Sequence, residues 1–176
     1  MKKILSILFL LTAVFFISCS ASNSVKGSWE LTRTLKTEFG DGENAESLGF
    51  FYTKQIIRYE FRAGGNYTKT VVQSFDKVEF QKKTPHEDYI KEQLSGLNSK
   101  TVIIGKYSEH SNILTLIPSM IRVDDFPVMS ADEYLEKNPT FQIKEDISFR
   151  RESEILYLQD EFVSYAEYRP ATPRHE

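Results

Sequence analysis

Two alternating segments, Gln55–Arg62 and Tyr67–Phe75, are separated only by the sequence Ala63-Gly64-Gly65-Asn66. In the first segment, apolar or aromatic side chains alternate with charged ones, which is the period of a strand with one buried face. Glycine and asparagine adopt the positive φ values that a tight hairpin turn needs. The chain is therefore expected to contain an antiparallel hairpin, and this restricts the fold more than any other feature of the sequence.

Further strands are predicted on both sides of this hairpin. Thr101–Tyr107 and Ile113–Ile117 form a second hairpin, which Pro118 is expected to end. Three closing strands are expected over Phe141–Phe149, Ile155–Gln159 and Phe162–Arg169.

Two short helices are predicted between the strands. Thr84 and Glu87 form a candidate capping box for a helix that ends near Gly96, and Ser130 and Glu133 do so for a helix over 130–138. Strands and helices do not alternate in a βαβ order, so a parallel sheet is not expected. The predicted fold class is mainly all-β, an antiparallel up-and-down barrel of eight to nine strands with two short helical insertions. A two-sheet sandwich would show similar strand spacing and stays an alternative.

The opening strand, Gly27–Leu35, contains the only tryptophan, Trp29. Arg33 lies on the same strand face as Trp29, and Glu145 interrupts the apolar face of its own strand in the same way. Unpaired charges inside a barrel are costly, so both are expected to pair, bind water or meet a polar group of a ligand. The alternatives are a bulge that reverses the local facing, or a position near a wet end of the barrel.

The function classes that the residues favour are limited. Tyr59, Tyr67 and Tyr107 are candidates for the wall of a ligand pocket, although tyrosines at strand spacing also fill barrels without binding anything. No catalytic constellation and no set of metal ligands is found, so neither an enzyme nor a cofactor is expected. A formal charge of −3 and the lack of a basic stripe argue against nucleic-acid binding.

The N-terminus has the pattern of an export signal. Two lysines precede an apolar stretch, and the segment Phe16-Ile17-Ser18-Cys19 contains the only cysteine. It resembles a bacterial lipobox, which implies a signal peptide over residues 1–18 and a diacylated Cys19 that holds the protein to membrane lipid. Residues 19–26 are polar and are expected to form a flexible tether. The resemblance implies the bacterial cell envelope, with the outer membrane favoured. An ordinary secretory signal with a chance cysteine is the alternative.

Three motifs in order resemble lipocalin-like bacterial lipoproteins: Gly27-Ser28-Trp29, the hairpin around Tyr59–Thr68, and Gly105-Lys106-Tyr107 followed by Leu114-Thr115-Leu116. The resemblance implies a barrel domain over residues 27–170, followed by a polar tail over 171–176. It implies that Gly27 and Trp29 are structural, with Arg169 over the tryptophan ring. The expected role is binding of a small apolar or amphipathic ligand without catalysis. The alternative is a filled barrel that engages a protein partner of the envelope or of a host.

Overall fold

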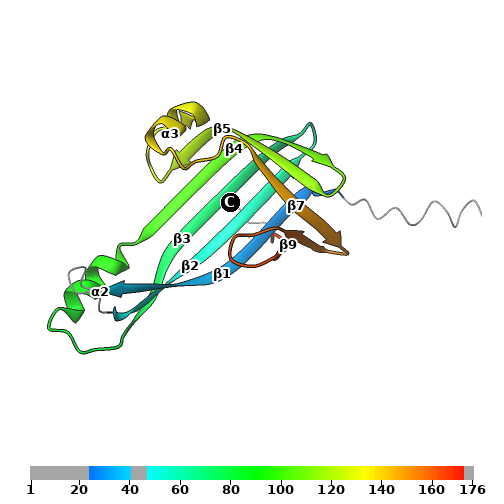
Figure 1. Ribbon diagram of the computed structural model, residues 1–176. Coiled ribbons are helices and arrows are strands. Elements are labelled where there is room, and N and C mark those ends of the chain that lie inside the picture. Colours follow the sequence, from blue (N-terminus) through cyan, green and yellow to red (C-terminus); the bar gives the residue numbers. More distant parts are fainter. Residues whose placement is uncertain (1–23, 41–46, 173–176) are drawn as a thin grey trace, which may run out of the picture.

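The computed structural model describes residues 24–40 and 47–172 of the chain. Antiparallel strands dominate these residues, and two short helices interrupt them (Figure 1). The elements are β1 (Gly27–Gly40), β2 (Ser47–Arg62), β3 (Asn66–Phe80), α2 (Glu87–Ser95), β4 (Asn98–His110), β5 (Ile113–Val123), β6 (Met129–Ser130), α3 (Ala131–Lys137), β7 (Glu145–Glu152), β8 (Ile155–Leu158) and β9 (Ala166–Pro170).

The strands close into a barrel in their sequence order. Each of β1 to β5 pairs with the next, β5 pairs with β7, and β9 returns to β1, where Trp29 lies opposite Pro170. The two-residue β6 adds to β5 outside this circuit. The predicted up-and-down barrel of eight to nine strands is therefore confirmed, and the sandwich alternative is wrong. Closure matters physically because it leaves few backbone groups on unpaired strand edges.

Pro118 does not end the second hairpin, contrary to the sequence prediction. β5 continues through it to Val123, while the register with β4 shifts between Ile104 and Gly105, opposite the proline. Proline lacks a backbone N–H, and a bulge is a place where a strand tolerates that loss. The hydroxyl of Ser119 donates to the carbonyl oxygen of Ile104 at 3.0 Å, which gives this carbonyl a partner at the irregularity.

Two of the closing strands start later than their alternation predicts. β7 begins at Glu145 instead of Phe141, because the Phe141 ring packs edge-on against Tyr134 of α3, with centroids 5.0 Å apart. β9 begins at Ala166 instead of Phe162, whose ring lies under the guanidinium of Arg33. In both places the aromatic side chain that suggested a strand lies in a loop, where its ring contacts a side chain of another element.

The helices follow the sequence signals to different extents. For α3, the predicted cap is present: the backbone N–H of Glu133 donates to the Ser130 hydroxyl at 3.1 Å. For α2, the helix begins at Glu87, and its N-cap is His86 without a side-chain bond. Only half of the predicted capping box exists, a bond of 3.3 Å from the Thr84 N–H to the Glu87 carboxylate. Pro85 and His86 form a turn there, so Thr84 lies too far from the helix to cap it.

Trp29 seals the closed end of the barrel. Its ring is 3% exposed, and its indole N–H donates to the carbonyl oxygen of Val25 at 2.6 Å. The cation over the ring is Arg151 of β7, with its guanidinium carbon 5.0 Å from the ring centroid. Arg169 is exposed on β9, in register with Glu30, so its predicted place over Trp29 is wrong.

The segment before β1 is part of the domain and not all of it is tether. Val25 is fully buried in the core, and the Arg151 guanidinium donates to the Ser24 carbonyl oxygen at 2.9 Å. The tether predicted over residues 19–26 is therefore wrong for Ser24 and Val25. The signal peptide and Cys19 lie outside the described residues. At the other end, the Ala171 N–H donates to the Ser28 carbonyl oxygen at 2.9 Å, so the predicted tail begins attached to β1.

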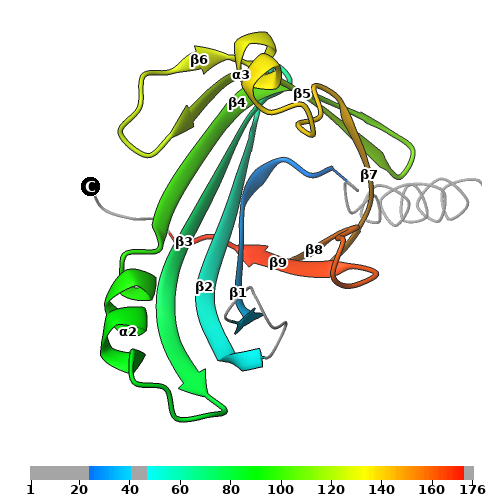
Figure 2. The ribbon, with the colours of Figure 1, turned by 60° about the vertical axis from the view of Figure 1, so that its left-hand side comes forward.

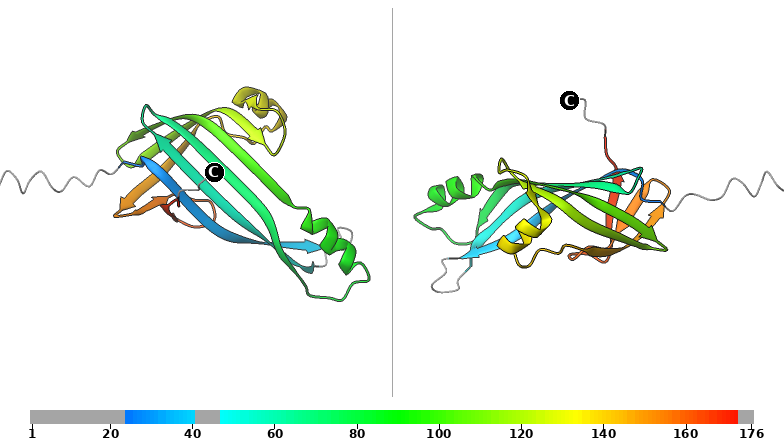
Figure 3. Two further views of the ribbon diagram at one scale, coloured as in Figure 1. Left: turned by 180° about the vertical axis from the view of Figure 1, so that it is seen from behind. Right: turned by 90° about the horizontal axis from the view of Figure 1, so that it is seen from above.

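The first three strands extend past the barrel as a three-stranded sheet. The register between β1 and β2 stays regular from Gly27 to Phe39, while the strands of β7 to β9 are short. Figure 2 shows this extension below the closed circuit, with α2 beside the end of β3, and Figure 3 shows it from behind. α3 packs instead against β5, where Ala131 is buried.

Candidate functional site

Inward-facing side chains divide the barrel into a packed end and a polar end. At the packed end, Trp29, Phe61, Tyr107 and Phe149 belong to one buried cluster. The Tyr107 ring meets Phe61 edge-on at 5.0 Å, and its hydroxyl donates to the carbonyl oxygen of Arg62 at 3.2 Å. Tyr107 was predicted to line a ligand pocket. The structure places it in the packed core with its hydroxyl already bonded, so it does not belong to the candidate site.

A layer of tyrosines lies above this packed end. Tyr59, Tyr67 and Tyr168 are each 2–3% exposed, and the rings of Tyr59 and Tyr168 meet edge-on at 5.6 Å. None of the three hydroxyls has a hydrogen-bond partner among the described residues. Within the same part of the chain, Ser47 Oγ is the only unbonded side-chain polar atom that is sealed from solvent. The three tyrosine hydroxyls have no partner in the described ranges and yet are not among the sealed atoms, so each of them borders space that a water molecule can reach.

Two charged side chains share this space with the tyrosines. Lys69 alternates inward between Tyr67 and Val71, and its ammonium lies 5.3 Å from the Tyr59 ring centroid. Glu145 is half-buried at the start of β7, on the same face as Ile147 and Phe149, which are both buried. Neither Lys69 nor Glu145 forms an ion pair within the described ranges. A cation and an anion thus face the tyrosine layer without neutralising each other.

The tyrosine pKa values report the same arrangement. Burial raises the pKa of all three phenols far above 10, since the charged form loses its hydration. For Tyr59, the negative charge of Glu145 is the next largest cause, and it also raises the pKa. Lys69 acts in the opposite direction on the pKa of Tyr67 and Tyr168. The phenols remain neutral at ordinary pH, as hydrogen-bond donors and acceptors.

Arg33 closes one side of the barrel mouth. Its Nη1 donates to both carboxylate oxygens of Asp160 at 2.9 Å, and its Nε donates to Gln55 Oε1 at 2.8 Å. Its guanidinium carbon lies 4.7 Å above the Phe162 ring. Asp160 also accepts from the Phe162 N–H at 2.9 Å. The loop between β8 and β9 is therefore fastened to β1 by one ion pair that is largely buried on both sides.

Arg33 and Glu145 both lie on the inner face of the barrel, as the alternation of their strands indicated. No bulge separates Arg33 from Trp29, so the alternative of a reversed facing is wrong for Arg33. Both residues lie toward the open end, as the other alternative expected. The pKa of Tyr59 responds to Glu145, Asp160 and Arg33, so these groups share one electrostatic environment. Of the predicted site residues, Arg33, Tyr59, Tyr67 and Glu145 come together, and Tyr107 does not.

Three residues of the site were missed by the sequence. Lys69 has the same signal as Arg33, a charge on the apolar parity of its strand, and the same rule would have found it. Tyr168 alternates with buried Ala166 and was equally visible. Asp160 lies in a loop, where no periodicity exists to indicate which way a side chain points.

An apolar surface continues outward from the mouth. On the extension of β1 to β3, the inward parity is occupied by half-buried phenylalanines. Phe39 packs edge-on against Phe80 at 5.7 Å and is tilted against Phe51 at 6.3 Å. The site therefore runs from tyrosine hydroxyls inside the barrel to phenylalanine rings outside it.

The tyrosine layer predicts alkaline instability. In the unfolded chain a phenol ionises near pH 10, whereas burial keeps it protonated in the folded chain. Stability from these groups is therefore complete below pH 10 and is lost above it, by up to about 1.4 kcal/mol per tyrosine per pH unit. Urea unfolding at a series of alkaline pH values measures the slope, which should be shallower for Tyr168→Phe. Ultraviolet absorbance of tyrosinate that develops fully before the fold is lost would contradict the assignment.

Other features of the described residues bear on classification. No group of three or more histidine, cysteine or acidic side chains is arranged to hold a metal ion in this part of the chain. Among the same residues, none of the helices has the length and apolarity to cross a membrane. No family model matches the sequence, and no curated protein resembles it closely enough to indicate a relative.

Proposed function

We propose that the protein binds a small amphipathic molecule at the mouth of its barrel and does not transform it. One observation carries this proposal: three buried tyrosine hydroxyls, which have no hydrogen-bond partner among the residues that the structure describes, border accessible space. Buried polar groups normally have hydrogen bonds, and leaving one unmade costs about 1–3 kcal/mol. A ligand with hydroxyl, amide or charged groups would supply those bonds.

The charges and rings around the tyrosines indicate how such a ligand would lie. Its polar end would meet Tyr59, with Lys69 and Glu145 available for opposite charges, and its apolar part would lie along the phenylalanines of the extension. The Arg33–Asp160 pair would form the rim between the two parts. The raised phenol pKa values support binding without catalysis, because a neutral phenol is a poor base and a poor nucleophile.

The test is native mass spectrometry of the protein purified from its own cell envelope. We expect a small molecule that co-purifies with the wild type, and a lower bound fraction in the double variant Tyr59→Phe/Tyr67→Phe. Tyr107→Phe is the matched control, because it also removes the hydroxyl of a core tyrosine, but a part-buried one at the packed end. Equal occupancy in the double variant and in the control would contradict the proposed site, as would an empty wild-type barrel.

We also propose that the mature chain is a lipoprotein of the bacterial cell envelope, held by acyl chains on Cys19. Support comes from the sequence, where the only cysteine follows an apolar export signal. Two acyl chains at about 0.8 kcal/mol per buried CH₂ group suffice for stable anchoring. Cys19→Ala is therefore expected to move the protein from the membrane fraction to the soluble fraction after fractionation of cells. A variant that stays in the membrane fraction would refute lipid anchoring.

A second candidate function is the engagement of an envelope or host protein. The loop between β8 and β9 favours it, because Phe162, Val163 and Tyr165 are all large, apolar and well exposed. Isolated exposed apolar residues are common, but a contiguous group is a feature of interaction sites. The mass spectrometry above distinguishes the candidates: a bound protein that Val163→Asp releases, with no small molecule, would favour this alternative.

A further inference from the structure

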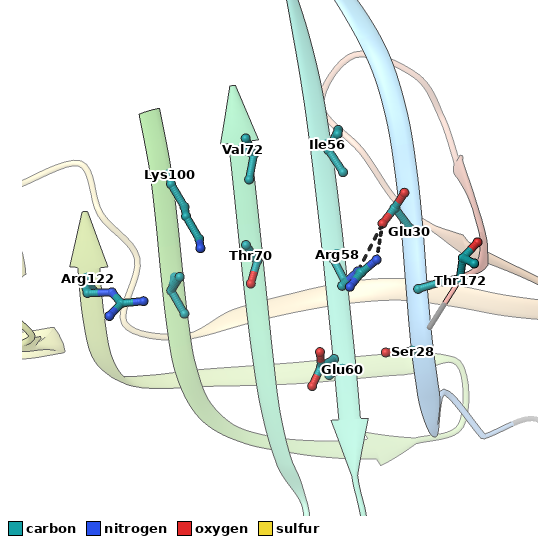
Figure 4. A pocket seen from close by; sticks show the side chains of 12 residues that line it. Ser28, Glu30, Ile56, Arg58, Glu60, Thr70, Val72, Lys100, Arg122 and Thr172 are labelled. Carbon is teal, nitrogen blue, oxygen red and sulfur yellow. Dashed lines mark hydrogen bonds and ion pairs between the residues drawn. The ribbon is translucent and has the colours of Figure 1, made fainter. Parts of the chain in front are cut away.

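A groove of about 620 Å³ crosses the outer face of the barrel, on the side of the sheet opposite the tyrosines. Strands β1 to β5 form its floor, and Ala171 and Thr172 border one end (Figure 4). These residues take no part in the site inside the barrel, because their side chains lie on the outer face of strands whose inner face lines the barrel. The groove therefore needs a separate explanation.

The middle of the groove is apolar. Ile56 and Val72 lie directly opposite each other on β2 and β3, and Val102 lies opposite Thr70 on the next strand pair. All three apolar side chains are half-buried. Because outward positions of a barrel in water are normally polar, this short apolar strip indicates a surface suited to an apolar group.

Two cations, Lys100 and Arg122, stand at one end of the strip. Lys100 lies opposite Val72 and Arg122 lies opposite Val102, so the two cations are diagonal neighbours across β4 and β5. Both side chains reach over the face toward Thr70 (Figure 4). Neither has a carboxylate within ion-pair distance in the described part of the chain. Like charges at neighbouring sheet positions repel, and an anion between them would remove that repulsion.

The opposite end of the groove is electrostatically different. Arg58 donates to the Glu30 carboxylate at 2.7 and 3.1 Å, so both of these charges are neutralised. Glu60 is likewise paired, with Arg62 at 2.8 Å. Among the described residues, the groove thus has one end where positive charge has no ion-pair partner and one end where the charges are paired.

A neighbouring concavity of about 530 Å³ limits where the anion can lie. It shares Lys100 and Arg122 with the groove, but Asp124 and Asp125 line its other side. The Asp124 carboxylate accepts the backbone N–H of Lys100 and is held in place. These two carboxylates would repel an anion from the second concavity. The favoured position is therefore on the groove side, above Val102.

We propose that this groove binds a small amphipathic anion, with a carboxylate head group between Lys100 and Arg122 and a short apolar body on Val102, Val72 and Ile56. The strip spans two strand spacings, which gives an apolar body about 10 Å long. This site is independent of the ligand proposed for the barrel mouth, since the two lie on opposite faces of the same strands.

The test uses octanoate as the probe and methyl resonances as the readout. Ile56 and Val72 face the groove, whereas their sequence neighbours Ile57 and Val71 face the barrel interior. Octanoate is expected to shift the first pair and not the second. The double variant Lys100→Gln/Arg122→Gln should bind about tenfold more weakly, because bonds to charged groups are lost. Lys106→Gln, on the same strand face but outside the groove, should bind as the wild type does.

Each other result overturns the proposal in a distinct way. Unchanged octanoate affinity in the double variant would remove the cations from the site. If acetate binds as tightly as octanoate, the apolar strip does not contribute to binding. If octanol binds as tightly as octanoate, the two cations do not contribute. Shifts confined to Ile57 and Val71 would refute the groove while supporting the site inside the barrel, so the two proposals fail separately.

Discussion

Trp29→Ala is expected to lower the free energy of unfolding by about 3–5 kcal/mol, the range for removing a large buried aromatic side chain. The indole is almost fully buried, donates to the Val25 carbonyl oxygen, and lies beneath the Arg151 guanidinium. Its loss would leave a void at the closed end and a buried carbonyl without a partner. Urea unfolding followed by far-ultraviolet circular dichroism measures the change, since no tryptophan fluorescence remains in the variant.

Two further variants divide this effect. Trp29→Phe keeps much of the ring volume but loses the N–H, so we expect a loss of about 1–3 kcal/mol from the unpaired Val25 carbonyl. Tyr89→Ala removes an exposed ring of α2 and should change stability by less than about 0.5 kcal/mol. If Trp29→Ala costs no more than Tyr89→Ala, the closed end does not depend on the tryptophan.

Gly105→Ala should cost about 3 kcal/mol, the upper part of the usual range for overpacking. A Cβ atom at this position would overlap the Ile117 carbonyl oxygen of the paired strand and lie 2.7 Å from Cε1 of Tyr67. The carbonyl belongs to the backbone beside the bulge at Pro118, so β4 and β5 would have to separate there. Urea unfolding measures the loss, and methyl spectra should show that it is centred on the β4–β5 pair.

Gly96→Ala provides the matched control. Gly96 has an ordinary helical φ of −77°, and a Cβ there would meet only the Gln93 carbonyl oxygen, at 3.5 Å. The change should therefore stay within about 0.5 kcal/mol. Equal losses at Gly96 and Gly105 would show that flexibility of the chain, and not close packing at Gly105, determines the effect.

The sequence predicts the barrel well where local chemistry decides the structure. The Gly64-Gly65 turn fixes the β2–β3 hairpin, and both glycines adopt positive φ. Strand ends are predicted poorly, since they depend on partners distant in sequence. Pro118 continues a strand because Gly105 and a bulge lie opposite, and Phe141 leaves a strand because Tyr134 is near. Neither reason is visible in the local pattern.

The residues of the candidate site likewise divide into those that local sequence predicts and those that it does not. Alternation placed Arg33 and Glu145 inside the barrel, since parity along a strand is a local property. It could not find Asp160, the partner of Arg33, because that residue is 127 positions away and lies in a loop. It also could not decide which arginine covers Trp29. Arg169 is nearer in the sheet pairing, but only Arg151 faces inward.

The attachment of Val25 and Ser24 at the closed end has a mechanical consequence. A pull on the chain ahead of Ser24 acts along the axis of β1, which pairs with β2 over its whole length but with β9 at only two positions. A force in this direction would shear the many backbone hydrogen bonds between β1 and β2, which must break together. The domain should therefore resist mechanical unfolding along this direction. The mouth, which Arg33 borders midway along β1, faces away from the end of the strand where the load is applied. A domain anchored through the chain that precedes Ser24 would therefore present its opening away from the point of anchoring.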